Sequence, residues 1–479
     1  MDEYLHQQAK MLLAAAPCSV EMPAGTGKTH LLAAAAAVAA EGSQRSLILT
    51  HTNAGVDAIR KRLKTFGIQS GLVRVDTITS WAFVLAGSYS DIAQVTVPEI
   101  PDWSHSGDYV EGATRVVASK VVRDVHTISF GYLFIDEYQD CTLIQHDFVL
   151  ALAVAVPKTV VFGDQLQAIF GFAGALVTWS GHIIPRFPEH AIAVKPHRWA
   201  GHNDELGTWL LEIRPQLVHG AIFDFRAHNV PGLQFVTNIG PTTLSTVAYS
   251  FRDKEESVVL LDKWARDVAN HASRLGGAYS VMEDIGGNFM RQQLESLPAE
   301  GNYLLASWFA RFAKNCVIGL AGIDQPVLSR LDSNEGITHY RRSGLANVIV
   351  AIDAIRTDPT YAQLAEAVAA MRQVKRLRVY RWEAWIDTCE AISKTAENGD
   401  PATDNLARVR DRVRRSGRRN TKRIASRTLL VKGLEYDHVV IADLAKFADP
   451  RNLYVALSRA RKSITVIGES PTIRLCNDS

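Results

Sequence analysis

The first residues able to do chemistry form a glycine-rich string, PAGTGKT, at residues 23–29. The string resembles the G-x-x-x-x-G-K-T loop that binds nucleotide phosphates, with Ala24 where a glycine often stands. In such a loop, backbone N–H groups surround phosphate oxygens at the start of a helix, which we expect to begin near Lys28. Lys28 would then reach the β- and γ-phosphates, and the Thr29 hydroxyl would bind Mg²⁺. The residues expected around the phosphates are Ala24, Gly25, Thr26, Gly27, Lys28, Thr29 and His30.

A second group is an apolar run that ends in acids, LFIDEYQD, at residues 133–140. At the end of a buried strand, Asp136 can hold Mg²⁺ and Glu137 can polarise the water that attacks the γ-phosphate. Acids at strand ends are often only solvated, and glycine-rich turns also occur by chance. The two strings nevertheless supply the parts of one reaction, so together they predict nucleotide hydrolysis.

These side chains need a scaffold, and the rest of the chain predicts an α/β fold. Short apolar runs alternate with helix-like stretches, a pattern typical of parallel strands covered by helices on both faces. The runs are residues 46–50, 133–136, 159–164, 191–194, 258–262, 439–443 and 464–468. Two stretches interrupt the pattern and are interpreted as insertions, a mixed one from about residue 84 and a mainly helical one from about residue 286.

Composition limits the class of protein. A chain of 479 residues is long enough for several units of roughly 100–200 residues each. Its 47% hydrophobic content excludes a disordered protein, and its net charge of +2 indicates no particular partner. Five scattered cysteines argue against disulfides or a zinc site. The start of the chain has no signal-peptide pattern, and the most apolar run, residues 31–40, is too short to span a bilayer. We therefore expect a cytoplasmic protein with no membrane partner.

Further strings follow in a fixed order, and together they resemble the motifs of UvrD/Rep-type superfamily 1 helicases. The glycine-rich loop and IDEYQD are two of these motifs. The others are THTNAGVDAIRKRL at 50–63, DTITSWA at 76–82, GDQLQAIFGFAGA at 163–175, KPHRW at 195–199, VKGLEYDHVVI at 431–441 and YVALSRAR at 454–461. The resemblance spans both ends of the chain. It implies ATP and Mg²⁺ as cofactors and DNA as the substrate.

The resemblance assigns more residues to the nucleotide. Gln8, 20 residues before Lys28, falls where the family reads adenine, an edge that a carboxamide suits because it can donate and accept. Gln139 matches a glutamine that is thought to sense the γ-phosphate and couple it to DNA. Glu435 is implied to bind the ribose, and Gly433 to approach the γ-phosphate.

Three further side chains are implied to complete the catalytic set. Gln167 matches a glutamine of the GDPDQ string, while Arg198 and Arg459 match arginines that contact the phosphates. Both arginines are expected in the second of two domains, with the nucleotide between the domains. ATP binding would then close the domains and hydrolysis would release them.

The DNA contacts are implied less specifically. Phe170 and Phe172 lie two residues apart, so on an extended segment they project to the same side and can stack on bases. Packing in a core is the alternative for such a pair, and the family uses both positions for stacking. His51 can also stack, and Asn53 and Thr77 are weaker candidates.

Three departures from the family pattern affect the DNA-coupling motifs and the adenine site. Ala173 replaces an arginine, Leu429 stands where a histidine is usual, and His197 replaces a tyrosine that would stack on adenine. The set of hydrolytic residues is complete while the set that couples to DNA is reduced, which favours weak or specialised coupling.

A dense basic run lies between Arg408 and Arg427, where ten of 20 residues are Lys or Arg. If the run is helical, one stripe follows a 4-3-4 spacing and consists of Arg408, Arg412, Arg415 and Arg419. The alternative is that Gly417 ends the helix. The only acid in the run is Asp411. Such density fits contact with nucleic acid, above all through Arg412, Arg415 and Arg419, with an acidic partner or simple solvation as alternatives.

The expected architecture is two RecA-like P-loop domains with parallel sheets, each carrying an inserted, mainly helical subdomain. The expected divisions are 1–83 and 128–188 for the ATP-binding domain, 84–127 for its insertion, 189–285 and 424–479 for the second domain, and 286–423 for the second insertion.

The implied function is ATP-dependent translocation on single-stranded DNA in the 3′→5′ direction, with unwinding of tailed duplex DNA as the output. One alternative is a DNA-stimulated ATPase subunit that regulates a partner nuclease and unwinds little. Another is a non-catalytic binding module, which the intact Lys28, Asp136, Glu137 and Arg459 disfavour. In size and architecture the chain also resembles the helicase component of Gabija-type anti-phage systems, which works beside an OLD-family nuclease.

Overall fold

The computed structural model describes residues 1–69, 71–98, 105–171, 174–220, 222–251, 255–284, 286–416 and 421–476, without the side chains of residues 413–416. Its contacts divide the chain into two compact units. The first comprises Met1–Phe223, Ala448–Lys462 and Arg474–Ser479, and the second comprises Asp224–Phe447 and Ser463–Ile473. Within the described residues, no helix combines the length and the apolar character needed to cross a membrane.

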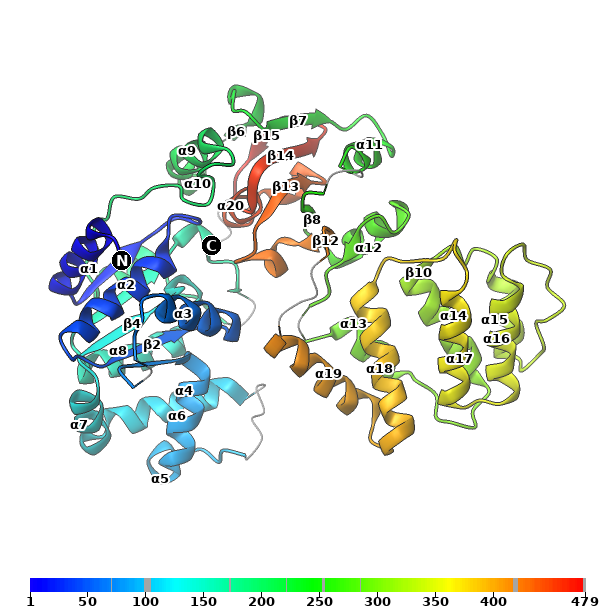
Figure 1. The fold of residues 1–479 in the computed structure, drawn as a ribbon, viewed down its shortest axis with the longest axis horizontal. Coiled ribbons are helices and arrows are strands. Elements are labelled where there is room, and N and C mark those ends of the chain that lie inside the picture. Colours follow the sequence, from blue (N-terminus) through cyan, green and yellow to red (C-terminus); the bar gives the residue numbers. More distant parts are fainter. Residues whose placement is uncertain are drawn as a thin grey trace. The chain divides into compact units, whose positions relative to one another are not determined.

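The first unit, in which Figure 1 labels β2 and β4, is built on a sheet of parallel strands. The order of its five strands is β1-β5-β4-β2-β3. The strands are β1 (Cys18–Glu21), β2 (Ser46–Thr50), β3 (Val73–Thr77), β4 (Tyr132–Ile135) and β5 (Thr159–Gly163). Successive side chains of a strand point to opposite faces, and in β2 Leu47 and Leu49 join one core while Ile48 joins the other. Both faces of the sheet are therefore covered, which is why β2, β4 and β5 are buried along their whole length.

Helices of the first unit cover both faces of this sheet. One face packs against α1 (Glu3–Ala15), α2 (Lys28–Glu41) and α3 (Asn53–Thr65). The other packs against α4 (Ile78–Ser88), α5 (Ser90–Ala93), α6 (Ser106–Ala118), α7 (Lys120–Ser129) and α8 (Leu143–Ala155). The described part of the stretch expected as a small insertion, 84–127, is thus helical and shares the core of the sheet. The remaining helices of the unit are α9 (Asp204–Glu212), α10 (Arg214–Val218) and α20 (Pro450–Leu457).

The second unit contains a six-stranded sheet in the order β7-β14-β13-β8-β12-β9. The strands are β7 (Leu233–Thr237), β8 (Val258–Asp262), β9 (Ser280–Val281), β12 (Arg423–Arg427), β13 (Tyr436–Ile441) and β14 (Ala460–Gly468). Strand β8 is buried throughout and lies parallel to both β12 and β13. Helices α11 (Thr243–Tyr249) and α12 (Ala265–Arg274) pack against this sheet. A short pair, β6 (Ile222–Asp224) and β15 (Thr472–Arg474), forms a separate ribbon.

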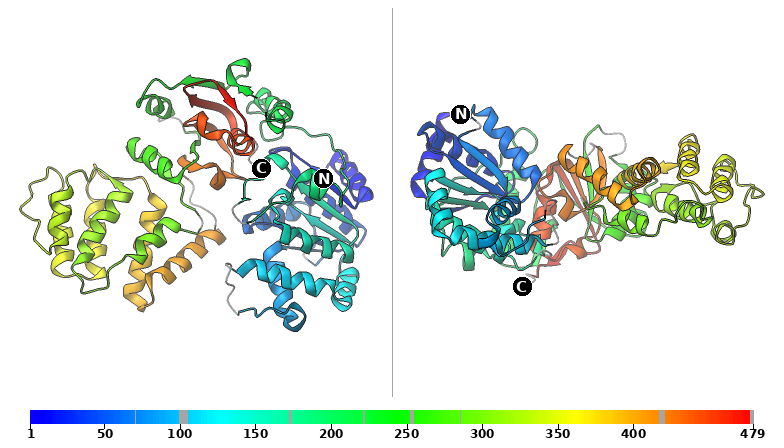
Figure 2. Two further views of the ribbon diagram at one scale, coloured as in Figure 1. Left: turned by 180° about the vertical axis from the view of Figure 1, so that it is seen from behind. Right: turned by 90° about the horizontal axis from the view of Figure 1, so that it is seen from below.

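A helical bundle completes the second unit (Figure 2). It contains α13 (Asn288–Glu295), α14 (Leu304–Cys316), α15 (Gln325–Asp332), α16 (Ala346–Thr357), α17 (Tyr361–Arg372), α18 (Trp382–Asn398) and α19 (Ala402–Ser416), with the strand pair β10 (Val317–Ile318) and β11 (Arg378–Val379). Its core includes a stack of aromatic rings in which Phe312 lies between Trp308 and Trp385. Two parallel sheets with helices on their faces and an inserted bundle confirm the predicted α/β fold class.

One local prediction was wrong. Residues 191–194 form no strand, although the run is apolar, because the segment beside β1 makes only a single bridge, between Ser19 and Glu189. The basic run between 408 and 427, for which a helix was left open, contains a helix and a strand in its described part. Helix α19 extends to Ser416, and β12 begins at Arg423 because Ile424, Ala425 and Ser426 are buried between neighbouring strands.

Candidate active site

The glycine-rich loop connects β1 to α2, which begins at Lys28 as predicted. Gly25 and Gly27 have φ angles of 74° and 92°, in the left-handed region that favours glycine. A Cβ on Gly25 would lie 2.7 Å from Cβ of Arg198, so a larger residue does not fit there. The loop therefore has the backbone conformation that directs N–H groups toward an anion at the start of a helix.

Neighbouring residues hold this loop in place. The Ala24 N–H donates to Oδ2 of Asp164 at 3.0 Å, and the Thr26 hydroxyl donates to the Pro23 carbonyl at 2.8 Å. The Arg198 N–H donates to the Gly25 carbonyl at 3.0 Å. Because three separate bonds fix its path, the loop is preorganised for phosphate.

The structure brings Lys28 together with the two predicted acids. Nζ of Lys28 lies 2.6 Å from Oε1 of Glu137 and 3.7 Å from Oδ1 of Asp136. Asp136 follows β4 directly and is almost fully buried. Glu137 adopts a φ of 57°, a conformation that is uncommon for a residue other than glycine and that recurs at functional sites.

Burial and nearby charges have opposite effects on the pKa values of Asp136 and Lys28. Burial raises the pKa of Asp136 to about 6, although Lys28 acts to lower it. Burial alone would lower the pKa of Lys28, but the carboxylates of Glu137 and Asp136 more than offset this and raise it, so Lys28 stays charged.

The donor set fits Mg²⁺ in particular. The hydroxyl of Thr29 and the carboxylate of Asp136 are hard oxygen ligands, and Mg²⁺ is commonly held by one or two protein ligands together with substrate phosphates. Among the described residues there is no group of three or more His, Cys, Asp or Glu side chains that would form a separate metal site.

A glutamine orients the candidate base. Nε2 of Gln139 donates to Oε2 of Glu137 at 2.6 Å, and Oε1 of Gln139 accepts from the Asp164 N–H at 3.0 Å. Gly163 makes room for this arrangement, because a Cβ there would lie 2.8 Å from Oε1 of Gln139. Gln139 therefore joins the end of β4 to the end of β5 through its side chain.

The two predicted arginines belong to the first compact unit. Arg459 is almost fully buried, and its Nη2 donates to Oε1 of Gln167 at 3.2 Å. Nε2 of Gln167 in turn donates to Oδ2 of Asp164 at 2.9 Å. Arg198 donates to the Ser458 carbonyl. Lys28, Asp136, Glu137, Gln167, Arg198 and Arg459 are thus parts of one unit, and their catalytic roles stay predictions.

This grouping differs from the expected division, which assigned 189–285 and 424–479 to the second domain. Residues 189–223 and 448–462 pack with each other and with the first sheet. The Trp199 indole N–H donates to the Ala460 carbonyl at 2.7 Å, and the Asn203 side chain donates to the Lys462 carbonyl at 2.9 Å. The finer four-part division stays a prediction.

Gln8, the side chain expected to read adenine, lies in the middle of α1. Nε2 of Gln8 donates to the Tyr4 hydroxyl at 3.0 Å, and Nζ of Lys195 lies 5.5 Å from the centroid of the Tyr4 ring. His30, on α2, contacts the Phe66 ring at 5.2 Å, and burial lowers its pKa. Tyr4 belongs to none of the helicase-like strings.

Gly433 and Glu435 lie in the second unit, between residues 428–431 and β13. Gly433 has a φ of 81°, and Glu435 is exposed. Their contact with the nucleotide stays a prediction.

The residues expected to contact DNA differ in exposure. Asn53 is exposed at the start of α3, whereas His51 is half-buried with Nε2 3.5 Å from Sγ of Cys141. Thr77 is buried and caps α4 by accepting from the Ser80 N–H at 3.0 Å, which leaves little of it for DNA. Phe170 is half-buried, and Phe172 lies outside the described residues.

Several arginines of the basic run are used inside the second unit. Arg410 is buried and pairs with Asp387 at 2.7 Å. Arg412 pairs with Glu390 at 3.0 Å, while its own side chain remains 64% exposed. Arg419 and the side chain of Arg415 lie outside the described residues. Of the four arginines expected on one stripe, Arg408, which pairs with Asp400, and Arg412 can therefore be placed.

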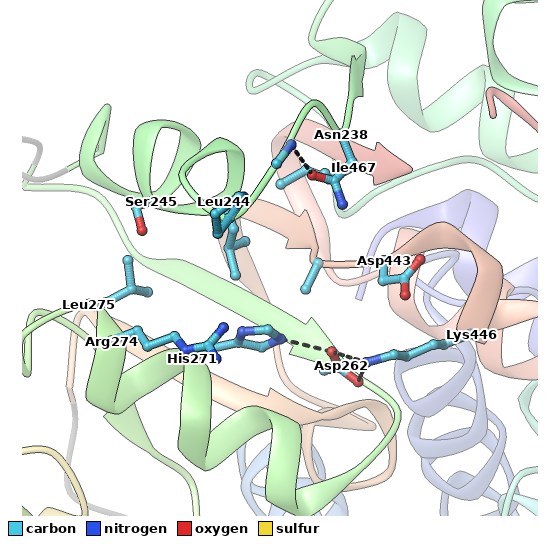
Figure 3. A pocket seen from close by; sticks show the side chains of 13 residues that line it. Asn238, Leu244, Ser245, Asp262, His271, Arg274, Leu275, Asp443, Lys446 and Ile467 are labelled. Carbon is cyan, nitrogen blue, oxygen red and sulfur yellow. Dashed lines mark hydrogen bonds and ion pairs between the residues drawn. The ribbon is translucent and has the colours of Figure 1, made fainter. Parts of the chain in front are cut away.

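A cavity of about 180 Å³ lies in the second unit at the carboxyl ends of its strands (Figure 3). Asp262, at the end of β8, is fully buried and accepts from Nε2 of His271 and Nζ of Lys446, both at 2.9 Å. Nζ of Lys446 also lies 2.6 Å from Asp267. Burial alone would raise the pKa of Asp262, but the bonds from His271 and Lys446 lower it. These contacts join β8, α12 and the segment after β13.

Comparison with known proteins identifies one segment of the chain. Residues 109–187 match the model of the UvrD/REP helicase N-terminal domain, a stretch that includes Asp136, Glu137 and Gln167. This match confirms the predicted resemblance to superfamily 1 helicases. No curated protein matches the chain. Among solved structures, a crystal structure of Pif1 helicase from Candida albicans aligns over 98% of this chain and 94% of that chain, at 11% identity and a TM-score of 0.41.

Proposed function

We propose that this protein, whose residues 109–187 match a helicase domain, couples ATP hydrolysis to movement along single-stranded DNA. One observation supports this most strongly. Lys28, Asp136 and Glu137 meet at the edge of a parallel sheet, beside a loop built to bind phosphate. Phosphoryl transfer requires positive charge at the γ-phosphate and an oriented water, and these residues can supply both.

Hydrolysis begins when phosphate oxygens replace the carboxylates as the partners of Lys28. Glu137 is then released to accept a proton from the attacking water, while Gln139 holds its other oxygen at 2.6 Å. Asp136 and Thr29 would hold Mg²⁺, which would neutralise charge on the phosphates. Arg459 and Arg198 stabilise the charge that develops in the transition state.

The contacts after β5 offer a route from DNA to the nucleotide. Gln167 ends a short turn, residues 165–167, and Phe170 follows three residues later. A base stacked on Phe170 would move this segment and with it the bond between Gln167 and Arg459. Movement in the 3′→5′ direction is the polarity that the family resemblance implies.

A second candidate function is a DNA-stimulated ATPase that serves a partner nuclease and unwinds little. It is favoured by Arg412, which keeps most of its side chain exposed on α19 although it pairs with Glu390. Such a surface can dock an acidic partner as readily as duplex DNA. An anti-phage role beside an OLD-family nuclease would be one form of this function.

Unwinding of tailed duplexes tests the proposal. The purified protein should release the labelled strand from a duplex with a 3′ single-stranded tail, in the presence of ATP and Mg²⁺, and should leave a 5′-tailed duplex intact. The matched control is Glu137→Gln, which should bind the same DNA without unwinding it. If DNA stimulates ATP hydrolysis but neither duplex is unwound, the second function is favoured. No hydrolysis with any DNA would contradict both.

A further inference from the structure

We propose that Arg214 is a positioning residue of the ATP site and acts through Asp164 on the phosphate-binding loop and on the pair Gln167–Arg459. The proposal rests on the proposed function, because it concerns the same site. Arg214 is the first residue of α10 and belongs to none of the helicase-like strings.

The position of Arg214 follows from the register of two strands. Strands β1 and β5 are parallel neighbours, and Glu21 is paired with Gly163, the residue before Asp164. Two carboxylates, those of Glu21 and Asp164, therefore lie at adjacent strand ends, and their side chains are 17% and 0% exposed. Two buried negative charges at this spacing would repel each other unless a cation lay between them.

Arg214 supplies that cation. Its Nη2 lies 2.5 Å from Oε1 of Glu21 and its Nη1 lies 2.9 Å from Oδ1 of Asp164, and its side chain is 11% exposed. The guanidinium also lies 4.9 Å from the centroid of the Tyr454 ring, on α20. Burial alone would lower the pKa of Arg214, but the carboxylates of Asp164 and Glu21 more than offset this and raise it. This direction fits a tightly held ion pair.

Asp164 connects Arg214 to the phosphate-binding loop and to Gln167. While Oδ1 faces Arg214, Oδ2 accepts from the Ala24 N–H at 3.0 Å and from Nε2 of Gln167 at 2.9 Å. The first of these bonds holds the phosphate-binding loop. The second fixes the carboxamide of Gln167, whose Oε1 accepts from Arg459 at 3.2 Å. A shift of Asp164 would therefore disturb the loop and the Arg459 side chain together.

A lysine cannot replace this arginine. The planar guanidinium presents two separate nitrogens to two carboxylates and lies over an aromatic ring, whereas an ammonium group is a single point charge. Arg214→Lys keeps the charge and loses the second contact, so it loosens Asp164 without leaving the carboxylates uncompensated. An Arg214 that served only to hold β1 to β5 would affect folding and leave catalysis of the folded protein unchanged.

The test is a double-mutant cycle on the full chain with Arg214→Lys and Gln167→Ala. The rate measured is the maximal ATP turnover with saturating single-stranded DNA, beside a thermal melt. If Arg214 acts through Gln167, each single variant lowers the rate and the double variant stays within about twofold of the slower single variant. The proposal would be overturned if the fold-decreases in rate of the two single variants multiply in the double variant. A wild-type rate in Arg214→Lys would also overturn it.

Two further variants keep the result decisive. Arg381→Lys is the matched control, since Arg381 pairs with Glu283 at 2.7 Å with similar burial but in the second unit. It should leave the rate within about twofold and combine additively with Gln167→Ala. If Arg214→Lys does not fold, the pair Glu21→Gln/Arg214→Lys replaces it, because it leaves one cation for the buried Asp164, and a wild-type rate in that variant refutes the positioning role. A wild-type protein that hydrolyses no ATP refutes the proposed function instead.

Discussion

Replacing Glu137 by glutamine should abolish ATP turnover while ATP binding persists. Both carboxylate oxygens are engaged at 2.6 Å, one by Lys28 and the other by Gln139. The amide has nearly the same shape but cannot take a proton from water, and the loss of a general base costs about 10²–10⁴ in rate. Asp136 and Thr29 are untouched, so Mg²⁺ coordination should survive.

Nucleotide affinity separates this reasoning from a simple loss of structure. Because the amide no longer holds Lys28 as an ion pair, the lysine is freer to meet phosphate, and the Kd for ATP should stay within about tenfold of the wild type or become lower. Lys28→Ala should lose both binding and turnover, since it removes the phosphate contact itself.

Steady-state hydrolysis with saturating single-stranded DNA and a separate equilibrium titration with ATP measure the two quantities. The matched control is Glu41→Gln at the end of α2, about 20 Å along the helix from Lys28, where the exposed carboxylate meets His6. That variant should turn over ATP at the wild-type rate. A near-normal rate in Glu137→Gln would refute the assignment of the base.

Other parts of the molecule lead to three more predictions. Phe170→Ala should weaken binding of single-stranded DNA by about 1–3 kcal/mol in a fluorescence anisotropy titration, with little change in hydrolysis without DNA; a large drop in melting temperature would instead make Phe170 a core residue. Because His271 and Lys446 lower the pKa of Asp262, that carboxylate contributes stability above its unfolded pKa of about 3.9, and the contribution is lost as the pH falls through its folded pKa. Chemical denaturation between neutral pH and pH 3 should therefore show a smaller loss for Asp262→Asn than for the wild type, and equal losses would contradict this. Arg412→Gln should leave DNA-stimulated hydrolysis intact and reduce the salt dependence of duplex binding if Arg412 contacts DNA; an unchanged salt dependence would favour a protein partner.

The positions of Lys28, Asp136 and Glu137 could be predicted because each is set by a short local string. A glycine-rich loop between a strand and a helix fixes where Lys28 lies, and a strand that ends in acids fixes Asp136 and Glu137. Their meeting at one edge follows from the parallel sheet, whose strand ends lie together. The short motifs in the sequence therefore identify most of the side chains that the structure brings together around the glycine-rich loop.

The residues that hold this set in place could not be predicted in the same way. Glu21, Asp164, Arg214 and Tyr454 come from four elements far apart in sequence, and only the register of β1 and β5 brings the first two together. No spacing pattern marks such a group. The strand β12 was hidden for a different reason, since pairing with β8 and β9 outweighs the helical pattern of the arginines before it.

Coupling of ATP hydrolysis to movement is tested most directly by the dependence of the turnover rate on DNA length. The purified protein is given ATP, Mg²⁺ and a series of single-stranded DNAs of increasing length, at equal total nucleotide concentration. A motor that moves along the strand spends a growing share of its time on longer strands before it dissociates, so the rate should rise with length and then level off. The same rate at every length above the size of the binding site would show that DNA only activates the ATPase, and would contradict movement along DNA.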